Sequence, residues 1–187
     1  MLRLFLAVDL PDPVRLEVAA LCTQVNKARW VKSHQLHITL RFMGQTPDDA
    51  LAELRERLDR VQVPAFDLAL RGAGVFPGGA SKRARVLWLG LEPVEPLACL
   101  KRALDAGLGP DAARAGQEFS PHLTLARFTE MPDATLAQFL ARHRDYQSAH
   151  FRVAWFKLYQ STLHSRGAVH DVLATYPLAE IARDDQT

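Results

Sequence analysis

One pattern occurs twice in this sequence, as HITLRFMGQTPDDALAEL at residues 37–54 and as HLTLARFTEMPDATLAQF at residues 122–139. Identical residues fall in register at a constant offset of 85 residues. They pair His37 with His122, Thr39 with Thr124, Leu40 with Leu125, Pro47 with Pro132, Asp48 with Asp133, Leu51 with Leu136 and Ala52 with Ala137. Seven matches at one spacing indicate a duplicated unit.

The segments around the two copies predict the same series of elements. The first half predicts a strand near 3–9, a helix with Asp12 as N-cap and Pro13 at its first position, a strand near 35–42, a helix after Thr46-Pro47 and a strand near 65–71. The second predicts a strand at 85–91, a helix ended by Gly107, a strand at His122, a helix after Pro132 and strands near 150–160 and 168–176. Each half reads β-α-β-α-β, so the fold class is α+β.

The chain reads as one domain over 1–187, with repeated halves at about 1–75 and 84–178 and a short polar tail at 182–187. A content of 48% hydrophobic residues supplies the core for one domain or two fused lobes. The stretch GAGVFPGGASKRAR, residues 72–85, is rich in Gly and basic residues and is interpreted as a surface loop between the halves.

Several classes of protein are disfavoured. Asp9 interrupts the apolar N-terminal stretch, which is too short for a signal peptide or a membrane span, so we expect a cytoplasmic protein without membrane association. Cys22 and Cys99 lack metal-ligand spacing and are expected to be buried, reduced thiols. A net charge of +2 does not fit a protein that coats nucleic acid, but it allows a small anionic substrate in a local basic cleft.

The remaining motifs and histidines add little. The sequence has no G-x-S-x-G elbow, P-loop or dinucleotide glycine motif. His34 and His37 would face opposite ways on a strand, so we expect no metal site and no cofactor. His164 and His170 flank a predicted hairpin turn and are interpreted as surface histidines. Lys82, Arg83 and Arg85 are interpreted as solvated loop charge.

The repeated His-x-Thr motif carries the chemistry. Because side chains alternate along a strand, His37 and Thr39 share one face while the neighbouring leucines and Ile38 occupy the other. The second copy places His122 with Thr124 in the same way. If the two halves face each other, one imidazole acts as base and the other as acid on a phosphodiester, and the threonine hydroxyls donate to phosphate oxygens. A core gains nothing from two histidines that take up protons.

At these residues the chain resembles the two-histidine (2H) phosphoesterase superfamily, and within it the bacterial and archaeal RNA 2′,3′-cyclic phosphodiesterases, also called 2′-5′ RNA ligases. The resemblance rests on RLFLAVDLP, RWVKSHQLHITLRFMG, GAGVFP with RVLWLG, FSPHLTLARF and LYQSTLHSRGAVHDVLATYPL. It implies a bilobal α+β fold with antiparallel sheets lining a central cleft, and no metal. It also implies hydrolysis of a terminal cyclic phosphate to a 2′-phosphomonoester, with weak, reversible, ATP-independent 2′-5′ joining.

Carried over by position, the resemblance makes His37 the general acid and His122 the general base, with Thr39 and Thr124 holding the phosphate. Arg127 becomes a phosphate or ribose contact and Phe42 a wall near the base, with a solvated strand end and core packing as the respective alternatives. Strict alternation places Arg127 on the leucine face, so we expect the strand to end or bulge there. Lys32-Ser33-His34 replaces a proline-containing turn of the family, and His170 replaces a tyrosine.

Two other functions stay open. The favoured substrate is RNA with a 2′,3′-cyclic phosphate end, or a small cyclic nucleotide. The first alternative is an enzyme of the same kind that acts on 2′-5′ oligoadenylate or on ADP-ribose cyclic phosphate. The non-enzymatic alternative is a module that binds RNA ends without turnover, which permanently charged Arg or Lys would serve better than histidine. We expect a monomer without an obligate protein partner.

Overall fold

The structure is a computed structural model that describes residues 1–78, 83–109, 119–164 and 167–180, so the predicted tail at 182–187 lies outside the described residues. Its strands are β1 (Leu2–Asp9), β2 (Arg29–Trp30), β3 (His37–Thr46), β4 (Phe66–Gly78), β5 (Arg83–Glu92), β6 (Leu123–Arg127), β7 (Phe151–Val153), β8 (Trp155–His164) and β9 (Gly167–Pro177). Its helices are α1 (Asp12–Leu21), α2 (Leu51–Asp59), α3 (Glu95–Leu108) and α4 (Ala134–Arg142), with short 3-10 turns η1 (Ser33–Gln35) and η2 (Asp48–Ala50). Among these helices, none is long and apolar enough to cross a membrane.

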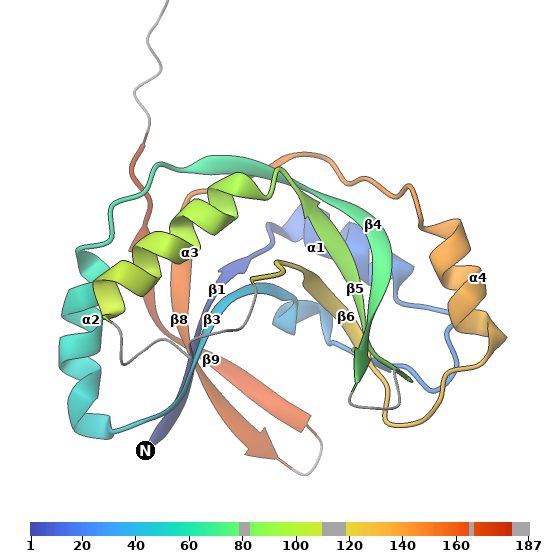
Figure 1. The fold of residues 1–187 in the computed structure, drawn as a ribbon, viewed down its shortest axis with the longest axis horizontal. Helices are drawn as coiled ribbons and strands as arrows, with labels where there is room; N and C mark the ends of the chain where they lie inside the picture. Colours follow the sequence, from blue (N-terminus) through green and yellow to red (C-terminus); the bar gives the residue numbers. More distant parts are fainter. Residues whose placement is uncertain (79–82, 110–118, 165–166, 181–187) are drawn as a thin grey trace, which may run out of the picture.

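The strands form one curled antiparallel sheet in the order β7-β4-β5-β6-β3-β1-β8-β9, with β2 paired to β6 (Figure 1). This order is symmetric about the junction of β6 and β3, which carry the two histidine motifs. The first strand of each repeat, β1 or β5, lies beside its own histidine strand. A later strand of each repeat, β4 of the first or β8 of the second, pairs instead with the first strand of the other repeat. The predicted α+β fold with two antiparallel lobes is confirmed, and each lobe contains strands from both repeats.

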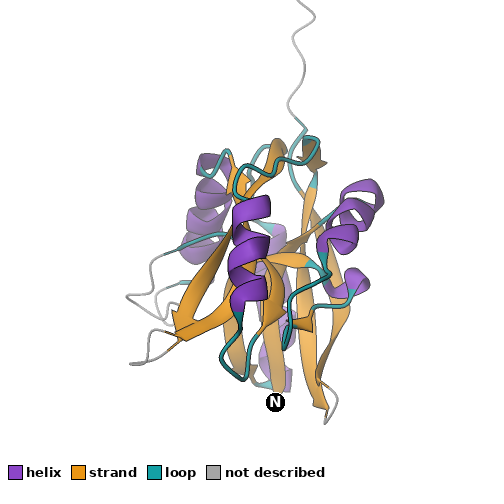
Figure 2. Cartoon of the chain, turned by 90° about the vertical axis from the view of Figure 1, so that its right-hand side faces the viewer, coloured by secondary structure: helices purple, strands orange, loops and turns teal. Residues whose placement is uncertain are grey.

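The helices lie on the outside of the curled sheet (Figure 2). Helices α2 and α3 pack together beside β9 and β3 at one end, and α4 lies at the other end beyond β4 (Figure 1). Apolar residues that recur at helical spacing face the sheet, such as Val14 and Val18 in α1. In α3 the buried residues are Leu97, Leu100, Leu104 and Leu108.

Several sequence-based boundaries are wrong. The stretch 72–85 is not a loop, because its described residues extend β4 and β5 into a long hairpin. Lys82 lies outside the described residues, whereas Arg85 lies on β5 and donates to the backbone oxygen of Thr129. Helix α3 passes through Gly107 and ends before Gly109, whose φ of +79° suits glycine.

Three further expectations are corrected by the local contacts. Pro11 is the N-cap of α1, and the Asp12 carboxylate accepts from Arg15 inside the first turn instead of capping the helix. His34 lies in η1, not on the histidine strand. Both cysteines are free thiols, but only Cys22 is partly buried and Cys99 is exposed, so the expected burial is wrong for Cys99.

Candidate active site

The two histidine strands meet at a single bonded pair, Ile38 opposite Leu123. Both side chains are fully buried, and the register places them in one row of core residues across four strands, formed by Val8, Ile38, Leu123 and Leu89. Extending this register by one residue places Thr124 opposite His37 and Thr39 opposite His122 on the other face of the sheet. The imidazoles are therefore diagonal neighbours, whose Cα atoms lie about 7–8 Å apart in a regular sheet.

Each histidine is held in the same way by its own strand. Nδ1 of His37 donates to the backbone oxygen of Gln35 at 2.7 Å, and Nδ1 of His122 donates to that of Ser120 at 2.8 Å. Because a carbonyl oxygen only accepts, the proton of each neutral ring must sit on Nδ1. Nε2 of both rings is then available to take up or deliver a proton.

Bulges bring Arg127 and Phe42 to the face of the histidines. Buried and exposed residues follow the same order in both strands over the six residues that begin at the histidine. In each strand two adjacent residues after the threonine are both buried, which interrupts the regular alternation. Register shifts mark the bulges, between Leu6 and Ala7 opposite β3 and between Leu87 and Trp88 opposite β6. The bulge expected near Arg127 is confirmed, and it returns Arg127 to the histidine face.

The two residues that follow the bulges differ in character. Arg127 is exposed, and its positive charge acts on the rings of His37, His122 and His170. Phe42 is 60% exposed with its ring centroid 6.1 Å from that of Phe5, so the alternative of core packing is wrong for Phe42.

Burial sets the protonation of the two imidazoles. It lowers the pKa of His37 to about 4, although the hydrogen bond to Gln35 partly offsets this effect. Burial also lowers the pKa of His122, with a smaller contribution from the charge of Arg127. Removing an imidazolium from water disfavours its charged form, so both rings are mainly neutral at pH 7 in the free protein.

His37 lies in an aromatic and charged cluster that the sequence analysis did not identify. Phe5 of β1 packs against it at a centroid distance of 5.0 Å and stacks on Tyr159 of β8 at 5.0 Å. Asp9 lies opposite His37 in the β1–β3 register and accepts hydrogen bonds from Tyr159 and from Lys157, the latter at 2.6 Å. Strand alternation alone would place Phe5 and Asp9 on one face of the first strand, but nothing in the sequence identified β8 as the neighbour of β1.

His170 is not the surface histidine that was expected. Its ring centroid lies 5.4 Å from that of His37 and 4.9 Å from that of Phe5, both nearly edge-on. The departure from tyrosine at this position was the only sequence signal for it. His164, on the same hairpin, is exposed as expected.

The surroundings of His122 are different. Phe76 of β4 lies edge-on to its ring at 4.7 Å and packs against Trp88 of β5 at 5.1 Å. Trp88 lies directly over Gly74, where an added Cβ would come within 2.3 Å of the indole. Glycine at 74 is therefore what allows the indole to lie over β4 beside Phe76.

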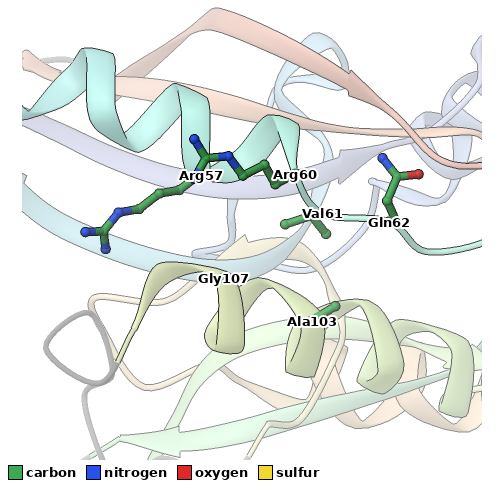
Figure 3. A pocket seen from close by; sticks show the side chains of 6 residues that line it. All are labelled: Arg57, Arg60, Val61, Gln62, Ala103 and Gly107. Atoms are coloured by element: carbon green, nitrogen blue, oxygen red, sulfur yellow. The ribbon is translucent and has the colours of Figure 1, made fainter.

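The described residues contain no group of three or more His, Cys, Asp and Glu side chains that could hold a metal. A hollow of about 380 Å³ lies apart from the histidines, between α2 and α3 (Figure 3). It is lined by Arg57, Arg60, Val61, Gln62, Ala103 and Gly107. Its arginines are engaged in pairs with Glu53 and Glu56, so it provides no unpaired charge for a ligand.

Known proteins share this sequence and fold. A family model described as the 2′-5′ RNA ligase superfamily matches residues 10–164. A Thermus thermophilus relative named RNA 2′,3′-cyclic phosphodiesterase is 35% identical over 194 residues, covering 95% of this chain and 90% of the relative. A solved structure of a Thermus thermophilus protein has a TM-score of 0.78 at 30% identity, covering 94% of this chain and 97% of that one.

A second solved structure, Escherichia coli LigT complexed with 3′-AMP, has a TM-score of 0.74 at 28% identity. The match covers 95% of this chain and 98% of LigT. The family model spans both copies of the paired motif completely, and the relatives align with nearly the whole chain. The chain belongs to the 2′-5′ RNA ligase superfamily.

Proposed function

We propose that this protein is an RNA 2′,3′-cyclic phosphodiesterase that opens a terminal cyclic phosphate to a 2′-phosphomonoester. The observation that carries the proposal is the placement of two identically hydrogen-bonded imidazoles as diagonal neighbours beside one buried pair. This arrangement supplies an acid and a base to a single phosphate without a cofactor. The relative that bears this activity as its name supports the choice of substrate.

In the proposed reaction, Nε2 of neutral His122 removes a proton from water, whose oxygen attacks the phosphorus. The bond from phosphorus to the 3′ oxygen breaks, and protonated His37 delivers its proton to that oxygen. The hydroxyls of Thr39 and Thr124 and the guanidinium of Arg127 stabilise the negative charge that builds on the phosphate oxygens. Phe42 forms a wall near the base. Water and the cyclic phosphate are thus converted into a 2′-phosphate and a 3′-hydroxyl.

The same site supports weak joining of RNA ends. When a 5′-hydroxyl replaces water, its oxygen attacks the phosphorus and the 3′ oxygen leaves, which forms a 2′-5′ linkage. No ATP is consumed because one phosphodiester bond replaces another. The near symmetry of the site lets the two imidazoles exchange roles in the reverse direction.

The proposed setting is the cytoplasm, with the protein acting as a monomer on RNA ends or small cyclic nucleotides. The two free thiols, Cys22 and Cys99, fit a reducing compartment. Size-exclusion chromatography coupled to light scattering tests the monomer directly.

The experiment uses three substrates with purified protein in EDTA. They are an oligonucleotide ending in a 2′,3′-cyclic phosphate, 2′-5′ oligoadenylate and ADP-ribose cyclic phosphate. We expect turnover of the first to a 2′-phosphate, with kcat lowered by about 10²–10⁴-fold in His37→Ala and in His122→Ala. His164→Ala, which changes an exposed histidine far from the paired motifs in sequence, is the control and should retain wild-type kcat.

The other outcomes are distinct. Turnover of only one of the other two substrates would assign a different substrate to the same chemistry. Binding of the oligonucleotide without product would identify an RNA-end-binding module instead of an enzyme. Full activity in both alanine variants would exclude the two-histidine mechanism.

A further inference from the structure

A third imidazole lies against His37, and the reaction described above does not use it. The rings of His37, His170 and Phe5 pack on one another, with centroid distances of 5.4 Å from His37 to His170, 4.9 Å from His170 to Phe5 and 5.0 Å from Phe5 to His37. The His170 ring stands nearly perpendicular to that of His37, at 86°. Its Nδ1 is buried and has no hydrogen-bond partner among the described residues.

The strand of His170 is also tied to the group that orients His37. The backbone oxygen of Gln35 accepts the hydrogen bond from His37, while the Gln35 side chain donates to the backbone oxygen of Ala168 at 2.9 Å. Ala168 lies two residues before His170 on β9. The ring of His37 and its hydrogen-bond acceptor are therefore both held against β9.

This arrangement breaks the symmetry of the two repeats. Among the described residues, the aromatic ring found against His122 is that of Phe76, and no second imidazole packs there. Phe76 cannot take up a proton, so only His37 has an additional imidazole packed against its ring, besides its partner in the reaction.

We propose that His170 is a positioning residue for His37. It fixes the plane of the His37 ring and, by taking up a proton first, keeps His37 neutral until the phosphate binds. The inference rests on the proposed function, because it assigns a role to a neighbour of a reacting imidazole. Burial lowers the pKa of His37 more than that of His170, so His170 accepts the first proton more readily, and its charge then opposes a second proton nearby.

The other charged groups around His37 do not replace this effect. Asp9 of β1 favours a proton on His37, but its carboxylate is already paired with Lys157 and hydrogen-bonded to Tyr159 of β8. Arg127 of β6 disfavours the proton but carries a constant charge. His170 is the imidazole in direct ring contact with His37, and its charge changes in the acidic range.

The charges that face His170 itself come from three strands. Arg3 of β1 and Arg127 of β6 disfavour its protonation, and Asp171 of β9 favours it. Burial is the main cause that lowers the pKa of His170, so this ring titrates in the acidic range.

The test follows the His37 ring by NMR during a pH titration of the ligand-free protein, so that the reading does not depend on turnover. We expect His170→Gln to raise the titration midpoint of His37 by about one pH unit, because the neighbouring charge is lost. The acidic limb of kcat/KM should move with it. His164→Gln is the matched control on the same hairpin and should leave both midpoints unchanged.

A second variant separates ring packing from charge. His170→Phe retains an aromatic ring against Phe5 and should keep kcat at its optimum within about threefold of wild type, whereas His170→Gln should lower it about tenfold. Circular dichroism verifies that both variants are folded. A His37 midpoint that is the same in His170→Gln and wild type would overturn the inference. A wild-type protein that fails to open the cyclic phosphate would instead overturn the proposed function.

Discussion

His37 and His122 make the same backbone hydrogen bond, yet they are buried to different degrees, and this difference governs the pH dependence of the reaction. The base must be neutral, so activity is lost as pH falls through its pKa. The acid must be protonated, so activity is lost as pH rises through its pKa. Burial brings the pKa of His37 to about 4 and that of His122 below 6.5. Both limbs of the pH profile of kcat/KM therefore lie at acidic pH, whichever of the two rings is the general acid.

We predict a bell-shaped profile of kcat/KM with its maximum between about pH 4 and pH 6.5. Initial rates at low substrate concentration across the acidic and neutral range measure it. The kcat profile should lie at higher pH, because the bound phosphate is negative and favours protonated imidazole. A kcat/KM that stays constant from about pH 5 to pH 8 would contradict two titrating imidazoles.

At the scale of single residues, sequence reasoning found the groups that repeat and missed those that do not. His37, Thr39, His122 and Thr124 were found because the same spacing occurs twice. Their strand alternation then fixed a common face. His170 was missed because alternation gives the face of a residue but not which distant strand lies across from it.

At the scale of elements, the β4–β5 hairpin supports His122 as β1 and β8 support His37. The sequence suggested a loop here because Gly, Pro and basic residues are typical of turns. The structure shows a tertiary reason for one of these glycines, since Gly74 makes room for the Trp88 indole. Close packing of this kind cannot be distinguished from a flexible loop in a single sequence.

We predict that Gly74→Ala lowers kcat/KM by about tenfold, because the displaced indole shifts Phe76 and with it the His122 ring. Crowding should also cost about 1–3 kcal/mol of unfolding free energy. Urea unfolding and steady-state kinetics measure the two effects. The matched control is Gly107→Ala on α3, where an added Cβ meets Val61 at an ordinary 3.4 Å and should leave kcat/KM unchanged. Wild-type kinetics in Gly74→Ala would show that Phe76 does not position His122.

At the scale of the whole molecule, the repeat is visible in the sequence but the exchange of strands between repeats is not. The offset of 85 residues predicted two similar β-α-β-α-β units. Pairing of β8 with β1 depends on contacts between residues far apart in the chain, whereas β4 and β5 pair as a hairpin across the boundary between the repeats. The halves at about 1–75 and 84–178 stay a prediction about the sequence repeat, because neither lobe of the sheet is built from one half alone.

The junction of the lobes should be the most sensitive part of the core. We predict that Ile38→Ala or Leu123→Ala lowers the unfolding free energy by about 2–5 kcal/mol, since each leaves a cavity at a fully buried site. The m-value in urea should not change. Leu16→Ala, at a position 69% exposed, is the control and should cost less than about 0.5 kcal/mol. An equal loss in all three variants would contradict a special role for the junction.

The single bonded pair between β3 and β6 also has a mechanical consequence. The pair of Ile38 and Leu123 acts as a fulcrum between the two lobes of the sheet. If one lobe rotates about this pair, the displacement of an atom grows with its distance from the pair. His37 and His122 each stand one residue from this fulcrum, whereas the last described pairs of the two hairpins, Gly78 with Arg83 and His164 with Gly167, lie several residues farther along their strands. Any rocking of one half against the other would therefore widen or narrow the entrance for a polymer while leaving the spacing of the two imidazoles almost constant.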